Sequence, residues 1–208
     1  MNTGRFANIL SGANGLPLWD SVLLDLGEVV VAPTLGSIIP DWVLAIPKSR
    51  SENIAQWCGE NRDAPLKIVA EIAQRFCVRR QGLIWFEHGP ATRGSVTGCG
   101  VDHAHLHILL RPPFSFSSFK RVSKLMSSLH WEEGNGNPYD RIERGASYLV
   151  AGCDGQSILA RSVEAAGSQF FRRVIAHLVN RVHLWDYSKH AHHENVAMTI
   201  ARYGDNAA

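Results

Sequence analysis

One stretch constrains this chain more than any other, the twelve residues from Val101 to Pro112. Within it three histidines alternate with small or apolar residues, in the order His103, Ala104, His105, Leu106, His107, Ile108. Alternation is the period of a β-strand, in which successive side chains point to opposite faces. We therefore expect the three imidazoles to share one face, with same-face neighbours roughly 6.5–7 Å apart, and the apolar partners to face a core.

Packing alone does not account for three imidazoles in a row, because histidine is a mediocre core residue. Two chemical interpretations remain open from these residues alone. The imidazoles could surround a phosphate or a similar anion, or they could hold a metal ion, since His-x-His pairs on strands are common zinc and iron ligands. In the metal interpretation Glu87 and His88, which end an earlier apolar run, could complete the ligand set.

Length and composition are those of a soluble globular protein. The 208 residues suffice for one ample domain with an extension, and 45% are hydrophobic and 19% charged. A net charge of +2 does not indicate that the protein binds a nucleic acid polymer, for which a concentrated basic patch is typical. We expect no membrane association and a cytoplasmic location with free thiols, because no apolar leader is visible and no Cys-x-x-Cys pair occurs among the four cysteines, Cys58, Cys77, Cys99 and Cys153.

The order of expected elements predicts an α+β fold. Short strands are expected over 21–27, 28–33 and 42–47, helices over 51–59 and from Asp63 to Gly82, and strands again over 83–88 and at the histidines. Strands followed by helices and then strands favour an antiparallel sheet with helices on one face. We expect a catalytic domain over 1–113 and, packed on it over 114–208, an extension of helices and a hairpin, with a mobile polar loop over 132–145.

The residues from His103 to Leu109 match the histidine-triad (HIT) motif, in which His alternates with apolar residues, at every position. Two flanking segments also resemble this superfamily. One is Trp42–Lys48, a strand ending in Ile-Pro-Lys, and the other is Phe86–Pro90, where members carry an amide residue. The resemblance spans about residues 21–113 and implies a HIT-like antiparallel sheet that forms a nucleotide-binding domain.

The resemblance also implies a reaction. Family members attack a nucleotide α-phosphate with the central histidine, form a nucleotidyl-histidine intermediate and need no cofactor. Carried over, His105 is the nucleophile, and His103 and His107 flank it and bond the phosphate. A neutral imidazole is nucleophilic at pH 7, and a covalent intermediate divides one hard displacement into two easier ones. We expect hydrolysis of a phosphoanhydride or phosphoramidate, as in dinucleoside polyphosphate or nucleoside phosphoramidate hydrolases.

Three positions differ from the family pattern. Arg50 follows Ile-Pro-Lys where a histidine is frequent, and it could bind phosphate through two parallel hydrogen bonds. Glu87 stands where members have Asn or Gln, and we expect it beside the triad with a catalytic role. Cys99 and Gly100 replace a polar side chain just before the triad, so backbone groups there would bind the substrate.

Further substrate contacts are expected from three places. Gly89 belongs to the Gly-rich loop that could bring backbone N–H groups to the phosphate. Pro33 and Thr34 end an early strand and could line the nucleoside pocket. Gln169 and Arg172 lie at the start of a helix in the second half and could reach the distal part of the substrate.

Several alternatives stay open. The chain could be a nucleotidyltransferase or a nucleotide-binding protein with little turnover, or it could be a metal-dependent hydrolase with histidine ligands. Family members are commonly dimeric, so a homodimer is also an expectation. The tract His190-Ala191-His192-His193 is more typical of a solvated loop than of a second metal site.

Overall fold

The computed structural model describes the chain except for residues 1–3, 13–14, 96, 98–102, 162 and 205–208. The strands are β1 (Leu24–Asp25), β2 (Val29–Pro33), β3 (Trp42–Pro47), β4 (Ile84–Gly89), β5 (Leu106–Leu109), β6 (Trp131–Asn135), β7 (Tyr148–Cys153) and β8 (Gln156–Arg161). The α-helices are α1 (Gly4–Ser11), α2 (Ile54–Cys58), α3 (Ala64–Arg75), α4 (Phe116–Leu125), α5 (Phe170–Leu178) and α6 (His193–Tyr203). Short 3-10 helices are η1 (Leu18–Asp20), η3 (Pro138–Arg141) and η4 (Val163–Ala166).

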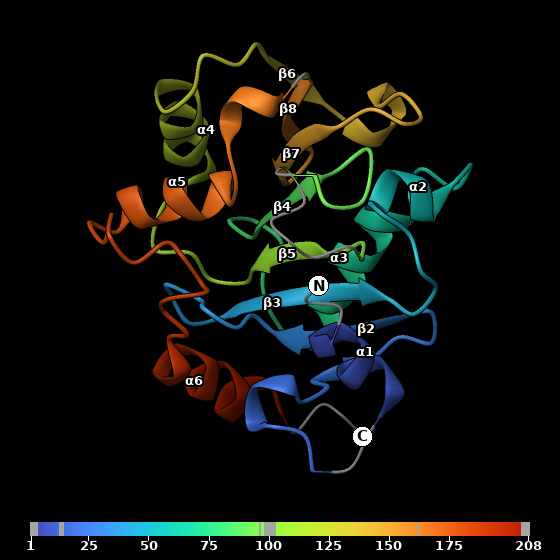
Figure 1. Cartoon of the computed structure of the whole chain (residues 1–208), viewed down its shortest axis with the longest axis vertical. Coiled ribbons are helices and arrows are strands. Elements are labelled where there is room, and N and C mark those ends of the chain that lie inside the picture. Colours follow the sequence, from blue (N-terminus) through green and yellow to red (C-terminus); the bar gives the residue numbers. More distant parts are fainter. Residues whose placement is uncertain (1–3, 13–14, 96, 98–102, 162, 205–208) are drawn as a thin grey trace.

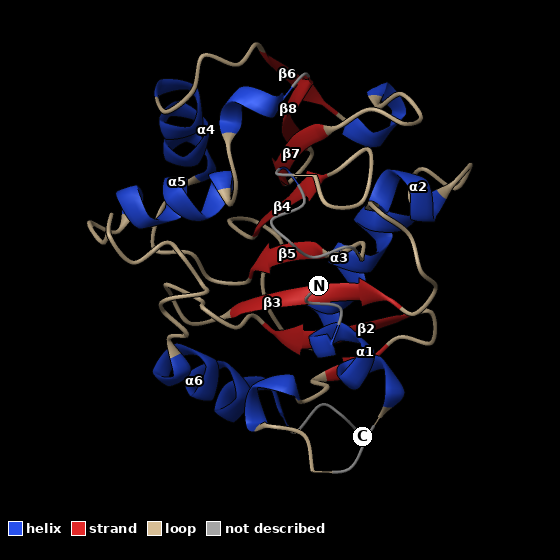
Figure 2. Cartoon of the chain, in the orientation of Figure 1, coloured by secondary structure: helices blue, strands red, loops and turns tan. Residues whose placement is uncertain are grey.

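The eight strands form one sheet in the order β1-β2-β3-β5-β4-β7-β8-β6, and every neighbouring pair is antiparallel (Figure 2). The predicted α+β class with an antiparallel sheet is thus confirmed. β5, which ends the histidine stretch, lies between β3 and β4 near the middle of the sheet. Its backbone is therefore bonded on both sides, and this holds His107 on a rigid support.

One face of the sheet packs against α2, α3 and η3. The apolar side of α3 buries Val69, Ile72 and Ala73 against strand residues such as Ile108 and Val150. The predicted start of this helix is confirmed, with Asp63 at the N-cap position and Pro65 in the first turn. Ala104, Leu106 and Ile108 belong to the same core, so the apolar partners of the histidines do face inward.

The opposite face of the sheet is covered as well, by α1 and by helices of the second half of the chain. α4 and α5 pack over β4, β7 and β8, and α1 packs over β2 and β3 (Figure 1). The physical reason is the composition of the strands. β2, β3, β4 and β7 are buried at every position, and strands apolar on both faces require cover on both.

The second half of the chain continues the same sheet. β7 pairs with β4 from Trp85↔Gly152 to Gly89↔Tyr148, and the predicted hairpin is confirmed as β7 and β8. The division into two domains at residue 113 stays a prediction. The sheet itself continues across this point, because β7 of the second half pairs with β4 of the first. α6 returns to the other end, where Thr199 and Tyr203 are buried near β3 and α3.

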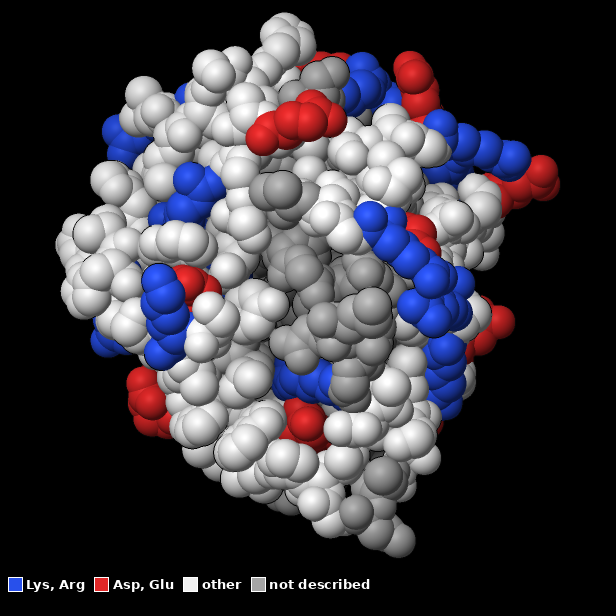
Figure 3. All heavy atoms as spheres, in the orientation of Figure 1, with Lys and Arg blue, Asp and Glu red and all other residues white. Residues whose placement is uncertain are grey.

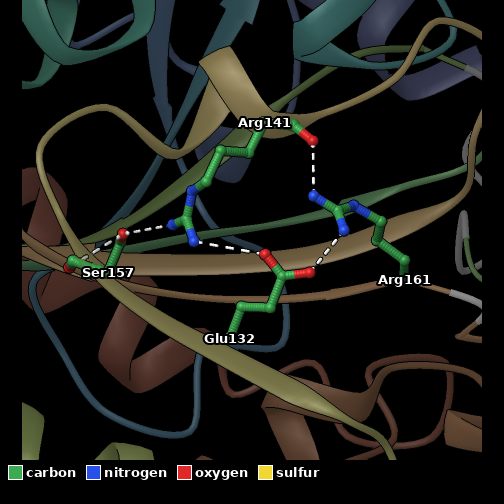
Figure 4. Close-up of polar contacts among 5 residues, drawn as sticks. Glu132, Arg141, Ser157 and Arg161 are labelled. Carbon is green, nitrogen blue, oxygen red and sulfur yellow. Dashed lines mark hydrogen bonds and ion pairs between the residues drawn. The ribbon is translucent and has the colours of Figure 1, made fainter.

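Residues 132–145, expected as a mobile loop, are mostly structured. β6 is an edge strand paired with β8, and Trp131 anchors it in the core. Figure 4 shows how Glu132 holds this edge: its carboxylate accepts from Arg161 at 2.5 Å and from Arg141 at 3.4 Å, and Arg141 also donates to Ser157 at 3.2 Å. The polar, Gly-rich composition of this segment does not predict a strand, because β6 lies at the edge of the sheet and has one exposed side.

No helix among the described residues is long and apolar enough to span a membrane. On the face drawn in Figure 3, basic and acidic side chains are interspersed, with the largest group of basic side chains along the edge near α2.

Candidate active site

A cavity of about 100 Å³ lies on the sheet face that α1 and α5 cover. His107 stands directly opposite Leu44 of β3 and Phe86 of β4, so these three side chains share that face. The lining comes from both halves of the chain and consists of Arg5, Phe6, Thr34, Leu35, Leu44, His88, His105, His107, Arg172 and Tyr187.

Two of the three triad histidines enter the cavity together. The rings of His105 and His107 are 4.9 Å apart between centroids, and Phe6 of α1 stands edge-on to His105 at 5.2 Å. β5 begins only at Leu106, so His103 and His105 precede the paired strand. The expected alternation of faces nevertheless holds, because Ala104 and Leu106 lie in the opposite core.

The backbone assigns the proton of His105. Its Nδ1 lies 2.9 Å from the carbonyl oxygen of His103. A carbonyl only accepts, so Nδ1 carries the hydrogen, and in the neutral ring Nε2 keeps its lone pair. Burial lowers the pKa of His105 to about 4, and the charges of His103, Arg5 and Arg172 act in the same direction. The ring is therefore neutral at pH 7, with a nucleophilic nitrogen at Nε2.

His107 is held in the other tautomer. The indole Nε1–H of Trp42 donates to His107 Nδ1 at 3.1 Å, and because an indole nitrogen only donates, Nδ1 is unprotonated. The neutral ring then carries its hydrogen on Nε2. Burial and the neighbouring His105, His88 and Arg172 keep the pKa of His107 well below its ordinary value. His107 is thus a neutral hydrogen-bond donor beside the neutral ring of His105, whose Nε2 keeps its lone pair.

His103 turns toward the end of β3 and is not part of the cavity lining. Its Nε2 lies 2.7 Å from the carbonyl oxygen of Pro47, to which it donates. Its own carbonyl accepts the Nδ1–H of His105. In this structure His103 therefore orients His105 and links it to the Ile-Pro-Lys segment.

Arg172 supplies positive charge to the cavity from α5. The side chain is almost fully buried, and its Nη2 donates to the carbonyl oxygens of Leu35 and Gly36 at 2.9 and 2.7 Å. The guanidinium lies 4.7 Å from the ring centroid of Trp42 and 5.4 Å from that of Tyr187. Aromatic faces and carbonyls fix the guanidinium in place without neutralising its charge.

Gly36 shows how closely the second half of the chain approaches this cavity. A Cβ at this position would lie 2.5 Å from Cβ of Tyr187 and 2.7 Å from Nη2 of Arg172, and its φ of +73° is in the left-handed region. The Gly36 N–H also donates to the carbonyl of Ala191 at 2.7 Å. Only glycine satisfies both conditions, so the loop after Thr34 and the segment before α6 close together over one side of the site.

Thr34 brings an unused hydroxyl to the lining. The residue is 3% exposed, and its Oγ1 has no hydrogen-bond partner among the described residues. A buried hydroxyl without a partner costs free energy, on the order of 1–3 kcal/mol. A ligand oxygen in the cavity would satisfy it.

Glu87 lies on the other side of the sheet, and the expectation that it stands beside the triad is wrong. Successive residues of β4 alternate, so Glu87 faces away from Phe86 and His107. Its carboxylate accepts from the N–H of Ile54 at 2.7 Å and from the hydroxyls of Tyr139 and Tyr148 at 3.0 and 2.7 Å. Burial raises its pKa to about 7 against the effect of these donors.

Gly89 likewise belongs to that opposite side and does not present a loop to the phosphate. A Cβ there would lie 2.2 Å from the ring of Tyr148, so the residue is small because an aromatic ring packs against it. Asn53 begins α2 nearby and donates to the carbonyl of Pro90 at 2.7 Å. The Glu87–Gly89 region thus anchors α2.

Three further predicted contacts fall outside the cavity lining, and two cannot be placed. Arg50 is exposed on the loop after β3. Pro33 is adjacent to the site but uses its carbonyl to accept from Arg5 at 3.0 Å. Gln169 is buried and orders the segment before α6 through Asp186 and the N–H of Tyr187, both at 3.3 Å. Cys99 and Gly100 lie outside the described residues.

Sequence reasoning missed several lining residues, and it named His88 only as a possible metal ligand although the sequence held a signal for its place in the lining. His88 is two residues after Phe86 in a strand, so period-two alternation places it on the face of the triad. Arg5, Phe6 and Tyr187 carried no such signal, because they come from distant segments. Among the described residues, no group of three or more His, Cys, Asp or Glu side chains is placed to hold a metal ion.

Comparisons with known proteins return structures but no sequence relatives. No family model and no curated protein matches the chain. A histidine triad protein from Clostridium difficile is 21% identical, over 50% of this chain and 86% of that chain, with a TM-score of 0.39. A HIT-like protein involved in cell-cycle regulation from Bartonella henselae is 22% identical, over 53% of this chain and 78% of that chain, with a TM-score of 0.35.

Proposed function

We propose that this chain is a histidine-triad-type nucleotide hydrolase that cleaves a phosphoanhydride or phosphoramidate bond at an α-phosphate. In this proposal Nε2 of His105 attacks phosphorus and forms a nucleotidyl-histidine, which water then hydrolyses. The observation that carries the proposal is the hydrogen bond from His105 Nδ1 to the His103 carbonyl, which leaves the Nε2 lone pair for attack. The triad motif in the sequence supports the same residue.

The surroundings of His105 suit a phosphoryl group. His107 offers a neutral Nε2–H, Arg172 a fixed positive charge and Thr34 an unused hydroxyl. Donors already in place stabilise the charge of the transferring group without reorganising. A cavity of about 100 Å³ is smaller than the roughly 300–1,000 Å³ of typical ligand sites. It therefore fits the phosphoryl group, and the nucleoside would extend beyond it.

The decisive experiment is detection of the intermediate. The protein is incubated with nucleoside phosphoramidates and dinucleoside polyphosphates, quenched in alkali and digested. Mass spectrometry then searches for a nucleotidyl adduct on the peptide that contains His105. We expect the adduct in the wild type and its loss in His105→Ala, with turnover reduced by at least about 10³-fold.

One control variant and two further measurements separate the proposed function from its rivals. His130→Ala changes an exposed histidine and should leave turnover unchanged. EDTA should also leave it unchanged, whereas activity lost in EDTA and restored by Zn²⁺ would favour the metal-dependent hydrolase. Nucleotide binding without any adduct or product would instead favour a binding protein, a candidate kept by the exposed position of Arg50, where the family often has a histidine.

A further inference from the structure

A fourth imidazole, His88, belongs to the cavity and has no counterpart in the triad motif. It follows Phe86 by two residues on β4, so it lies on the face of His107. The centroids of the His88 and His107 rings are 6.0 Å apart, and the rings are nearly perpendicular. His88 is 7% exposed and lines the cavity with His105 and Arg172.

The two ring nitrogens of His88 are in different situations. The backbone N–H of Phe171 donates to Nε2 at 3.1 Å. This N–H lies in the first turn of α5, where backbone donors have no partner within the helix. Nε2 is therefore unprotonated, and the neutral ring carries its hydrogen on Nδ1. In the described part of the chain Nδ1 has no hydrogen-bond partner.

His88 also remains neutral over the whole physiological range. Burial lowers the pKa of His88 to about 3, and the charges of His105, Arg172 and Arg173 act in the same direction. A neutral imidazole N–H is a hydrogen-bond donor that does not compete for the proton of a leaving group. It stabilises negative charge without becoming a general acid.

We propose that His88 is a fourth catalytic imidazole, whose Nδ1–H donates to a non-bridging oxygen of the phosphoryl group as His105 attacks. This inference rests on the proposed function and deepens it. The bond from His105 Nε2 to phosphorus forms while the bond from phosphorus to the leaving oxygen or nitrogen breaks. The leaving group departs with the bonding electron pair, an anhydride oxygen as the phosphate anion and a phosphoramidate nitrogen as the amine after it takes a proton from water. The hydrogen stays on Nδ1 of His88 throughout, so the contact transfers no proton and adds no step. The substrate class it fits is a phosphoryl group that enters deeply enough to meet both β4 and β5.

The competing explanation is that His88 only satisfies the first turn of α5. Two variants separate the two roles. In His88→Gln the side-chain oxygen can take the place of Nε2 and accept from Phe171, but no donor remains near the position of Nδ1. In His88→Asn the amide nitrogen lies near the position of Nδ1 and donates, but nothing accepts the Phe171 N–H.

The measurement is the single-turnover rate of adduct formation at His105, beside kcat, KM and the melting temperature. We expect His88→Gln to lower the adduct rate and kcat by about 10–100-fold with KM and melting temperature nearly unchanged. We expect His88→Asn to melt at a lower temperature yet keep the adduct rate within a few-fold of the wild type. His177→Gln changes an exposed histidine of the same helix and should match the wild type in every readout.

The outcomes are distinguishable. A wild-type adduct rate in His88→Gln would overturn the role of His88 and leave the proposed function standing. An adduct rate that falls in His88→Asn alone, together with its stability, would likewise reduce His88 to a support for α5. Absence of any adduct in the wild type would overturn both the proposed function and this inference.

Discussion

At the scale of single residues, each imidazole with an assigned proton has a partner of fixed polarity. The carbonyl of His103 places the hydrogen of His105 on Nδ1. The Trp42 indole donates to Nδ1 of His107 and the Phe171 N–H donates to Nε2 of His88, so these two nitrogens carry no hydrogen. His105 is thereby an acceptor toward the cavity through Nε2, and His107 is a donor through the corresponding nitrogen. Chemically identical side chains acquire different roles because their second nitrogens have different neighbours.

Trp42 is a positioning residue, since it acts through His107. Trp42→Phe keeps a buried aromatic ring under Arg172 but removes the donor to His107 Nδ1. We expect His107 to populate both tautomers, and the adduct rate to fall by about tenfold. Nitrogen-15 NMR of the ring nitrogens measures the tautomer directly.

A matched control is available in the same chain. Trp131, the first residue of β6, also has an indole donor, which bonds Ser127 Oγ at 3.1 Å. Trp131→Phe removes this donor. It should change neither the tautomer of His107 nor the adduct rate. Trp42→Phe with an unchanged nitrogen spectrum and rate would show that Trp42 only fills space.

At the scale of elements, strand alternation divides β4 between two tasks. Phe86 and His88 face the cavity, and Glu87 faces the helix layer, where it joins the start of α2 to Tyr139 and Tyr148. Three donors from three segments meet one carboxyl group. Such a buried network is strong only when every member is satisfied, so Glu87 supports the architecture around the site.

Glu87→Gln should test this structural role. The amide replaces one acceptor oxygen by a donor that faces hydroxyls and an N–H, so we expect a loss of about 1–3 kcal/mol in the free energy of unfolding. Urea denaturation measures the loss. The adduct rate of the folded variant should stay close to that of the wild type, and a large fall in that rate at unchanged stability would instead restore the catalytic role first expected of Glu87.

At the scale of the whole molecule, both halves of the chain build one sheet and one cavity. β3, β4 and β5 from the first half carry His88 and His107, and α5 and the segment before α6 bring Arg172 and Tyr187. α1 adds Arg5 and Phe6 over the triad. The cavity is thus lined by segments up to about 180 residues apart, and the burial of His88 and His107 depends on the complete fold.

The lowered pKa values of three imidazoles predict an acid-sensitive fold. His88, His105 and His107 have pKa values below their ordinary 6.5, so each contributes stability above about pH 6.5 that is lost as pH falls toward 4. Glu87, with its pKa raised to about 7, acts oppositely and contributes stability that is lost as pH rises through 7. Because three groups oppose one, the free energy of unfolding should fall between pH 7 and pH 5. Each of the three histidines contributes a loss on the order of 2 kcal/mol, from which the gain from Glu87 is subtracted.

Urea unfolding at a series of pH values checks this balance. His88→Gln removes one titrating imidazole and should flatten the fall in stability. Glu87→Gln removes the opposing group and should steepen it. A stability that is constant or rises from pH 7 to pH 5 in the wild type would contradict the lowered pKa values of the three rings.

The sequence by itself determined the features that depend on local periodicity. The alternation around His105, the N-cap at Asp63 and the hairpin of β7 and β8 follow from spacing that each segment carries alone. Alternation also places His88 on the face of the triad. These features are short in range, so side-chain direction and turn chemistry suffice to predict them.

Only the tertiary structure decided which side chains meet. Glu87 and His88 are adjacent in sequence, yet one binds the start of α2 and the other lines the cavity with Arg172. Arg5, Phe6 and Tyr187 line the cavity together with His105, although they come from the two ends of the chain, because α1 and the segment before α6 fold over one sheet face. The tautomers followed in turn, since a ring nitrogen takes its role from the partner that long-range packing brings to it, and no local pattern specifies that partner.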